Sequence, residues 1–189
     1  MNRLSYLIEK ERQVGLSKKE YDEVCEIFAN TCDKDIKTKC IIIIRKEASP
    51  AREQIVSREL SINNPILQSE VLRFLVRDLD LGNKYQDHVI KLLNLEDDQY
   101  ALYTLQLAAL SVSGDAYRSS KNLHILELIL KFLEHDRKSL KNAAHDALVS
   151  ALTSNYRELS PKLRYEKLTN SDIDLYKEKA LNIIHGGKN

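Results

Sequence analysis

The chain has 189 residues, enough for one domain with a core or for one short stack of helical repeats. Its 29 lysines and arginines balance 28 aspartates and glutamates, so the net charge is +1, without the basic excess typical of nucleic-acid-binding proteins. Nucleic acid is therefore the disfavoured partner, and a local basic patch is the alternative that this balance leaves open.

Three cysteines, an odd number, exclude the disulfide framework of a small secreted domain. On one continuous helix, Cys25 and Cys32 would lie about 10 Å apart, too far to be bridged. We expect reduced thiols that line the core. No stretch approaches the roughly 20 apolar residues of a membrane helix, and the N-terminal residues do not follow a signal-peptide pattern. These features predict a cytoplasmic protein with no membrane span.

Prolines and glycines divide the chain into helices. Each proline follows a residue that can cap a helix and is expected at the first helical position, where its missing N–H is not needed. Each glycine follows a helical run and is expected to end it. The prolines are Pro50, Pro65 and Pro161, and the glycines are Gly15, Gly82, Gly114, Gly186 and Gly187.

Apolar residues repeat with a helical period along most of the chain. The second helix begins after Ser17, which with Glu20 forms a capping box. Small residues such as Ala143, Ala144 and Ala147 predict a helix with a close neighbour. The predicted helices are 2–14, the helix after Ser17, 34–47, 50–61, 65–81, 84–95, 98–113, 122–134, 139–154, 161–168 and 171–186.

Two parts of this pattern depart from a single apolar stripe. The run from Cys40 to Ile44 contains four consecutive isoleucines, which favour a strand. Its charged flanks and the lack of a partner strand favour a buried helix, with the strand as the alternative. The segments 100–112 and 123–133 are apolar on more than one stripe, which predicts helices packed on two sides.

A weak repeat links two segments. When Asp98 is laid over Asp136, a shift of 38 residues, Leu110 meets Leu148 and Ala109 meets Ala147. The pattern resembles the second helix of HEAT-like repeats over about half of the chain. The resemblance implies a single all-α domain, 1–189, of antiparallel helix pairs stacked as a short solenoid, with partners bound on its concave face. An irregular helical bundle is the alternative.

No motif specifies chemistry. His124 and Glu127 could share a helix face, but a zinc site needs further ligands. The acidic clusters fall mostly in first helical turns, where they offset the helix dipole. We therefore expect no metal, no cofactor and no enzymatic activity.

Tyrosine and arginine suggest a contact surface instead, because both are enriched where proteins bind proteins. The candidate partner-binding residues are Tyr117, Arg118, Tyr156, Arg157, Arg164 and Tyr165. By analogy with small helical proteins that lack cofactors, we expect a protein-binding module, specifically an immunity or inhibitor protein that neutralises a cognate bacterial toxin. The alternatives are a nucleic-acid-binding HEAT-like repeat protein and a generic helical scaffold.

Overall fold

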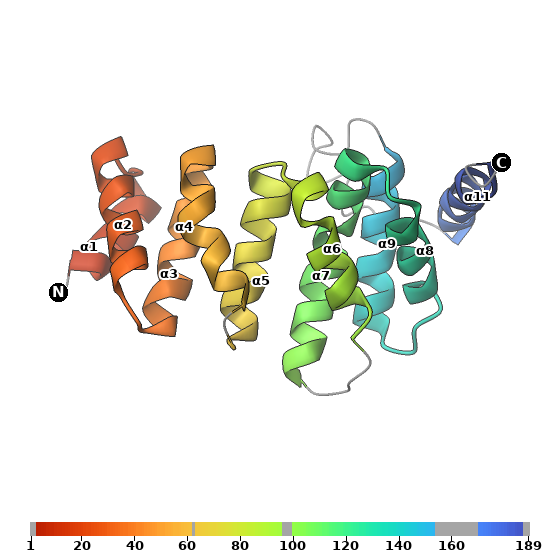
Figure 1. The fold of residues 1–189 in the computed structure, drawn as a ribbon, viewed down its shortest axis with the longest axis horizontal. Coiled ribbons are helices and arrows are strands. Elements are labelled where there is room, and N and C mark those ends of the chain that lie inside the picture. Colours follow the sequence, from red (N-terminus) through yellow and green to blue (C-terminus); the bar gives the residue numbers. More distant parts are fainter. Residues whose placement is uncertain (1–2, 62, 96–99, 154–169, 187–189) are drawn as a thin grey trace. The chain divides into compact units, whose positions relative to one another are not determined.

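In the computed structural model, the described residues are 3–61, 63–95, 100–153 and 170–186 (Figure 1). Within these ranges the chain forms ten α-helices and no strand, which confirms the all-α prediction. The chain divides into two compact units, Met1–Leu79 and Asp80–Asn189, and each is described by itself. The expectation of a single domain stays a prediction.

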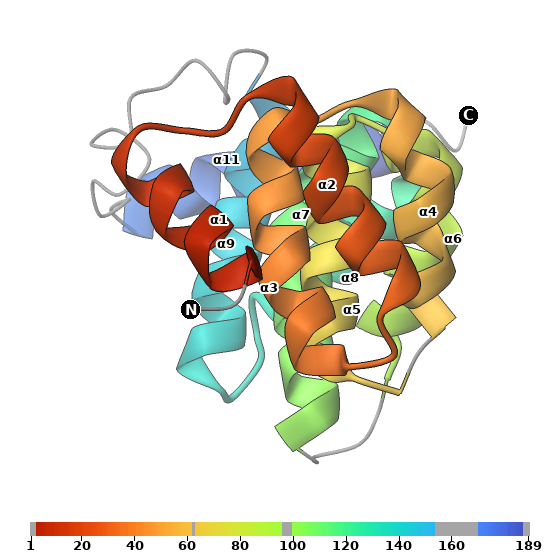
Figure 2. The same ribbon diagram turned by 90° about the vertical axis from the view of Figure 1, so that its left-hand side faces the viewer.

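Unit 1 is built around a central helix, α3 (Lys34–Ile44), which packs against α2 (Lys18–Asn30) on one side and α5 (Pro65–Arg73) on the other. Helix α1 (Arg3–Gln13) lies against α2 (Figure 2). The predicted helix 50–61 is instead a short α4 (Glu53–Ser57) between two 3₁₀ turns, and helix 65–81 ends in a π-helical turn, Phe74–Asp78. The remaining elements are the 3₁₀ turns Arg45–Glu47, Pro50–Arg52 and Arg58–Ser61.

The isoleucine run lies in α3, so the helix prediction for Cys40–Ile44 is confirmed. The Asp33 carboxylate caps this helix by accepting hydrogen bonds from the N–H groups of Asp35 (2.8 Å) and Ile36 (3.1 Å). Four residues of the run are buried, whereas Ile42 is 51% exposed. Burial between two helices therefore outweighs the β-propensity of the run.

The cysteines differ in burial more than we expected. Cys40 is fully buried, Cys25 is half-buried and Cys32 is exposed, so the prediction of core-lining thiols is wrong for Cys32. Burial raises the pKa of the Cys40 thiol to about 12. Cys40 is thus a small apolar core residue under ordinary conditions.

Several predicted helix ends in unit 1 are confirmed. Pro50 and Pro65 each stand first in a helical element, and the Asn64 side chain accepts a hydrogen bond from the Leu67 N–H. The Glu20 carboxylate accepts a hydrogen bond from the Ser17 N–H at 2.9 Å, as a capping box requires. Gly15 follows α1 with a φ of 81°, the left-handed conformation that glycine adopts readily. Pro161 and Gly187 lie outside the described residues.

Unit 2 is built around α7 (Tyr100–Ser120), which packs against α6 (Gly82–Leu93), α8 (Leu123–Phe132) and α9 (Lys138–Leu152). The last helix, α11 (Asn170–Gly186), packs on α8 and α9 (Figure 1). Both α7 and α8 contact several helices, which confirms that they are packed on more than one side. The helix expected at 161–168 lies outside the described residues.

Two glycines of unit 2 do not end helices, contrary to our prediction. Gly82 begins α6, and Gly114 lies inside α7, which continues to Ser120. A Cβ at Gly114 would lie 2.5 Å from the Ala147 carbonyl oxygen and 2.6 Å from the Ser150 Cβ on α9. At Gly82 a Cβ would meet Ser119 and the Ala116 Cα of α7. Both glycines therefore serve close helix contacts rather than turns.

The contact at Gly114 can be tested by substitution. We expect Gly114→Ala to lower the free energy of unfolding by about 1–3 kcal/mol, because the added methyl group forces α7 and α9 apart. Gly186→Ala is the matched control, since a Cβ there meets nothing within 4 Å. Urea unfolding followed by circular dichroism measures both variants. Equal stability of the two variants would contradict the role assigned to Gly114.

Candidate functional site

The surface predicted from tyrosine and arginine is only partly described. Tyr156, Arg157, Arg164 and Tyr165 lie outside the described residues, so their role stays a prediction. Tyr117 lies on α7 and is 5% exposed, with the Lys121 ammonium 5.6 Å from its ring centre. Burial raises the pKa of its phenol. Its ring therefore packs in the interior of unit 2 and presents no contact face to solvent.

Arg118, the next residue of that set, joins α7 to α9. Its guanidinium donates hydrogen bonds to the Ser150 carbonyl, to the Ser150 hydroxyl (2.8 Å) and to the Asp115 carboxylate. The Asp115 side chain is only 2% exposed. A buried carboxylate of this kind requires charged or polar partners, so Arg118 has a structural role.

This structural role predicts a loss of stability when Arg118 is replaced. Arg118→Ala should lower the free energy of unfolding by about 3 kcal/mol, because it removes a cation from the buried Asp115. Arg3→Ala is the control: it breaks the exposed Arg3–Glu23 ion pair and should change stability little. Thermal and urea unfolding report the difference. A partner-binding Arg118 without a structural role would leave both variants equally stable.

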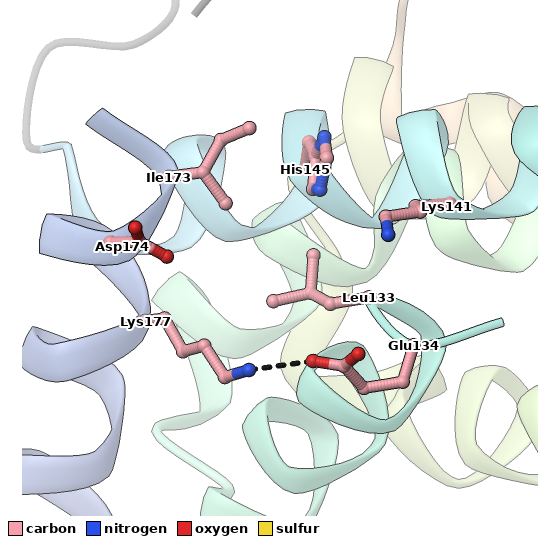
Figure 3. Close-up of a pocket in the computed structure, with 7 residues that line it drawn as sticks. All are labelled: Leu133, Glu134, Lys141, His145, Ile173, Asp174 and Lys177. Atoms are coloured by element: carbon pink, nitrogen blue, oxygen red, sulfur yellow. Dashed lines mark hydrogen bonds and ion pairs between the residues drawn. The ribbon is translucent and has the colours of Figure 1, made fainter. Parts of the chain in front are cut away.

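A surface pocket of about 310 Å³ lies where α11 meets the end of α8 and the first half of α9 (Figure 3). We call it the α9–α11 pocket. The Lys177 ammonium on α11 forms a hydrogen-bonded ion pair of 2.6 Å with the Glu134 carboxylate, which closes one side. The pocket is lined by Leu133, Glu134, Lys141, His145, Ile173, Asp174 and Lys177.

Charges of both signs line the α9–α11 pocket. Burial, and then the positive charge of Lys141 one turn away on α9, lower the pKa of His145. The ion pair with Lys177 lowers the pKa of Glu134. His145 is therefore neutral at pH 7, between two lysines and two carboxylates. This mixed lining suits hydrogen bonding to a polar surface, and it provides no concentration of one charge for a phosphate.

The environment of His145 predicts a titration. Its pKa should lie below the ordinary value of about 6.5, and Lys141→Gln should raise it by removing a nearby positive charge. Because the folded protein binds fewer protons at His145 than the unfolded chain, stability present above about pH 6.5 should be lost as the pH falls through the lowered pKa.

NMR titration of the histidines measures the pKa of His145 in the wild type, in Lys141→Gln and in a control variant. Lys131→Gln is the control, since Lys131 is exposed on α8 and does not line the pocket. If both substitutions moved the pKa of His145 equally, the influence assigned to Lys141 would be refuted.

A second pocket, of about 190 Å³, lies in unit 1 and is lined by residues of α1, of α3 and of the 3₁₀ turn that follows α3. We call it the α1–α3 pocket. Three isoleucine side chains form its apolar part, and charged side chains surround them. It is lined by Ile8, Glu11, Arg12, Lys39, Ile42, Ile43 and Lys46. Ile42, at 51% exposure, leaves much of its aliphatic surface in water.

The sequence did not single out the α1–α3 pocket. The signal was Ile42 itself, which lies about 100° around the helix from each neighbouring isoleucine and so cannot share their buried side completely. The charged residues at 39 and 46 follow the same face, since they stand three residues before and four after Ile42. The position of α1 beside that face could not be read from α3 alone.

Within the described parts of the chain, no three or more histidine, cysteine, aspartate or glutamate side chains are placed to hold a metal ion. His124 and Glu127 do share a face, with 3.3 Å between their side chains, and both are exposed to solvent. No helix of the described ranges is long and apolar enough to cross a membrane.

Comparison with known proteins adds no relative. No protein-family model matches the chain, and no curated protein matches it significantly.

Proposed function

We propose that this protein is a non-enzymatic protein-binding module, and specifically an immunity or inhibitor protein that neutralises a cognate bacterial toxin. The α1–α3 pocket carries the proposal. Exposed aliphatic surface in a recess loses contact with water when a partner's side chain enters it, which favours association. Protein interfaces have an apolar centre and a polar rim, and the pocket has the same order, with isoleucines surrounded by charged side chains.

The charged groups of unit 1 support a scaffold rather than a catalyst. Lys37 pairs with Glu59 at 2.5 Å, and Arg45 pairs with both Glu70 (2.5 Å) and Asp78 (2.6 Å). These pairs connect helices that are distant in the sequence. They also neutralise Arg45, one of the basic residues that a nucleic-acid-binding patch would need.

The HEAT-like arrangement is part of the same proposal. The segments that align at a shift of 38 residues are α7 and α9, which pack directly against each other. Ala109, Ala147 and Leu148 of the aligned positions are all buried. Equivalent buried positions on neighbouring helices are what a repeated helix pair would produce.

A toxin-protection experiment tests this function. Each gene next to that of this chain would first be expressed alone to find one whose product stops growth. The chain would then be co-expressed with that product, and growth and complex formation would be measured. We expect restored growth and a stoichiometric complex on size-exclusion chromatography, because the immunity protein covers a functional surface of the toxin. Absence of both a complex and protection would overturn the toxin-immunity function.

A further inference from the structure

We infer that the α1–α3 pocket binds an aliphatic side chain flanked by carboxylates on a partner protein. This inference rests on the proposed protein-binding function and specifies the partner's chemistry. It combines two observations. The isoleucines of the pocket leave aliphatic surface in contact with water, and of the charged groups around them the carboxylate is buried whereas the cations face solvent.

The aliphatic part of the pocket is large enough for a side chain. Its volume of about 190 Å³ exceeds that of an engineered apolar cavity, about 150 Å³, that binds benzene. Ile8 comes from α1 whereas Ile42 and Ile43 come from α3, so two helices form the walls. A leucine, isoleucine or valine of the partner would contact all three.

The acidic residue of the pocket is already engaged. The Glu11 carboxylate accepts a hydrogen bond from the Tyr21 hydroxyl at 3.0 Å and pairs with the Lys46 ammonium at 3.1 Å. The Glu11 side chain is only 8% exposed, whereas that of Lys46 is 50% exposed. The negative charge thus lies inside the structure, and the positive charge faces solvent.

The other two cations, Arg12 and Lys39, also face solvent. The Arg12 side chain is 72% exposed, and its ion pair with Glu9 is long, 3.9 Å between two solvated groups, so it leaves the guanidinium open to a better acceptor. Lys39 is exposed and forms no ion pair with any described residue. Carboxylates beside the partner's aliphatic residue would therefore find positive charge on both helices.

The same features favour a protein over other anionic partners. The pocket lining contains no aromatic ring on which a nucleic-acid base could stack. Its three isoleucines are flanked by four charged side chains, one of them the carboxylate of Glu11, whereas insertion into a membrane surface requires a wider apolar face. An acidic protein segment with aliphatic residues can contact the isoleucines of the pocket and also pair with its cations.

The test uses the full chain with isoleucine methyl groups labelled for NMR. The probe is a short synthetic peptide in which two leucines are flanked by glutamates. Two matched peptides replace either the glutamates by lysines or the leucines by alanines. We expect the first peptide to shift the methyl signals of Ile8, Ile42 and Ile43, and its affinity to fall as salt is raised.

Substitutions locate the binding site. Ile42→Asp and Lys39→Glu should each weaken peptide binding about tenfold or more, because one introduces a carboxylate into the aliphatic part and the other reverses a charge. The controls are Ile66→Asp, an isoleucine of the same unit that is 57% exposed, and Lys19→Glu on α2. Neither residue lines the pocket, and both controls should bind like the wild type.

Several outcomes would overturn the inference: no methyl shifts, equal binding of the lysine peptide, shifts outside the pocket, or displacement of the peptide by anionic lipid vesicles. The toxin complex separates this inference from the proposed function. A complex that forms equally well with Ile42→Asp refutes the role of the pocket and leaves the function standing. Peptide binding at the pocket without any toxin complex refutes toxin immunity and leaves the pocket standing.

Discussion

The close approach of α7 to its neighbours is the constraint on which unit 2 depends. Gly114 brings α7 against α9, and Gly82 brings α6 against α7, each at distances that leave no room for a methyl group. Interiors are packed as densely as organic crystals, so a change of one carbon at such a contact moves whole helices. The position of α9 in turn fixes where Lys141 and His145 lie, and therefore the shape of the α9–α11 pocket (Figure 3).

Unit 1 is held together in a different way. Its core is aliphatic, but ion pairs between helices define how the helices align: Lys10 with Glu20, Lys37 with Glu59, and Arg45 with two carboxylates. The carboxylate of Glu20 shows the strength of one such arrangement, since Lys10 and the Ser17 backbone lower its pKa to about 2. These ion pairs lie between helical elements, whereas the cations that line the α1–α3 pocket face solvent.

Local signals in the sequence predicted where helices begin and end, but they did not predict which helices pack against each other. Caps at Asn64 and Ser17, and the conformation of Gly15, follow from a few adjacent residues, and these predictions are confirmed. Gly114 and Gly82 were misplaced because a glycine needed for helix contact looks identical to one that ends a helix until the partner helix is known. Ile42 was missed for the same reason, since its exposure depends on where α1 lies. Tyr117 resembled a contact residue by type, but its burial is a property of the packing of α7.

The distribution of cysteine has a practical consequence. All three cysteines belong to unit 1, and the 110 residues from Asp80 onward contain none. Because Cys40 is fully enclosed, a thiol reagent can reach it only when α3 separates from its neighbours. The rate at which Cys40 is alkylated under native conditions therefore reports how often unit 1 opens. Unit 2 contains no cysteine and contributes nothing to this rate. The wild-type protein thus carries an intrinsic probe for asking whether its two units unfold together or separately.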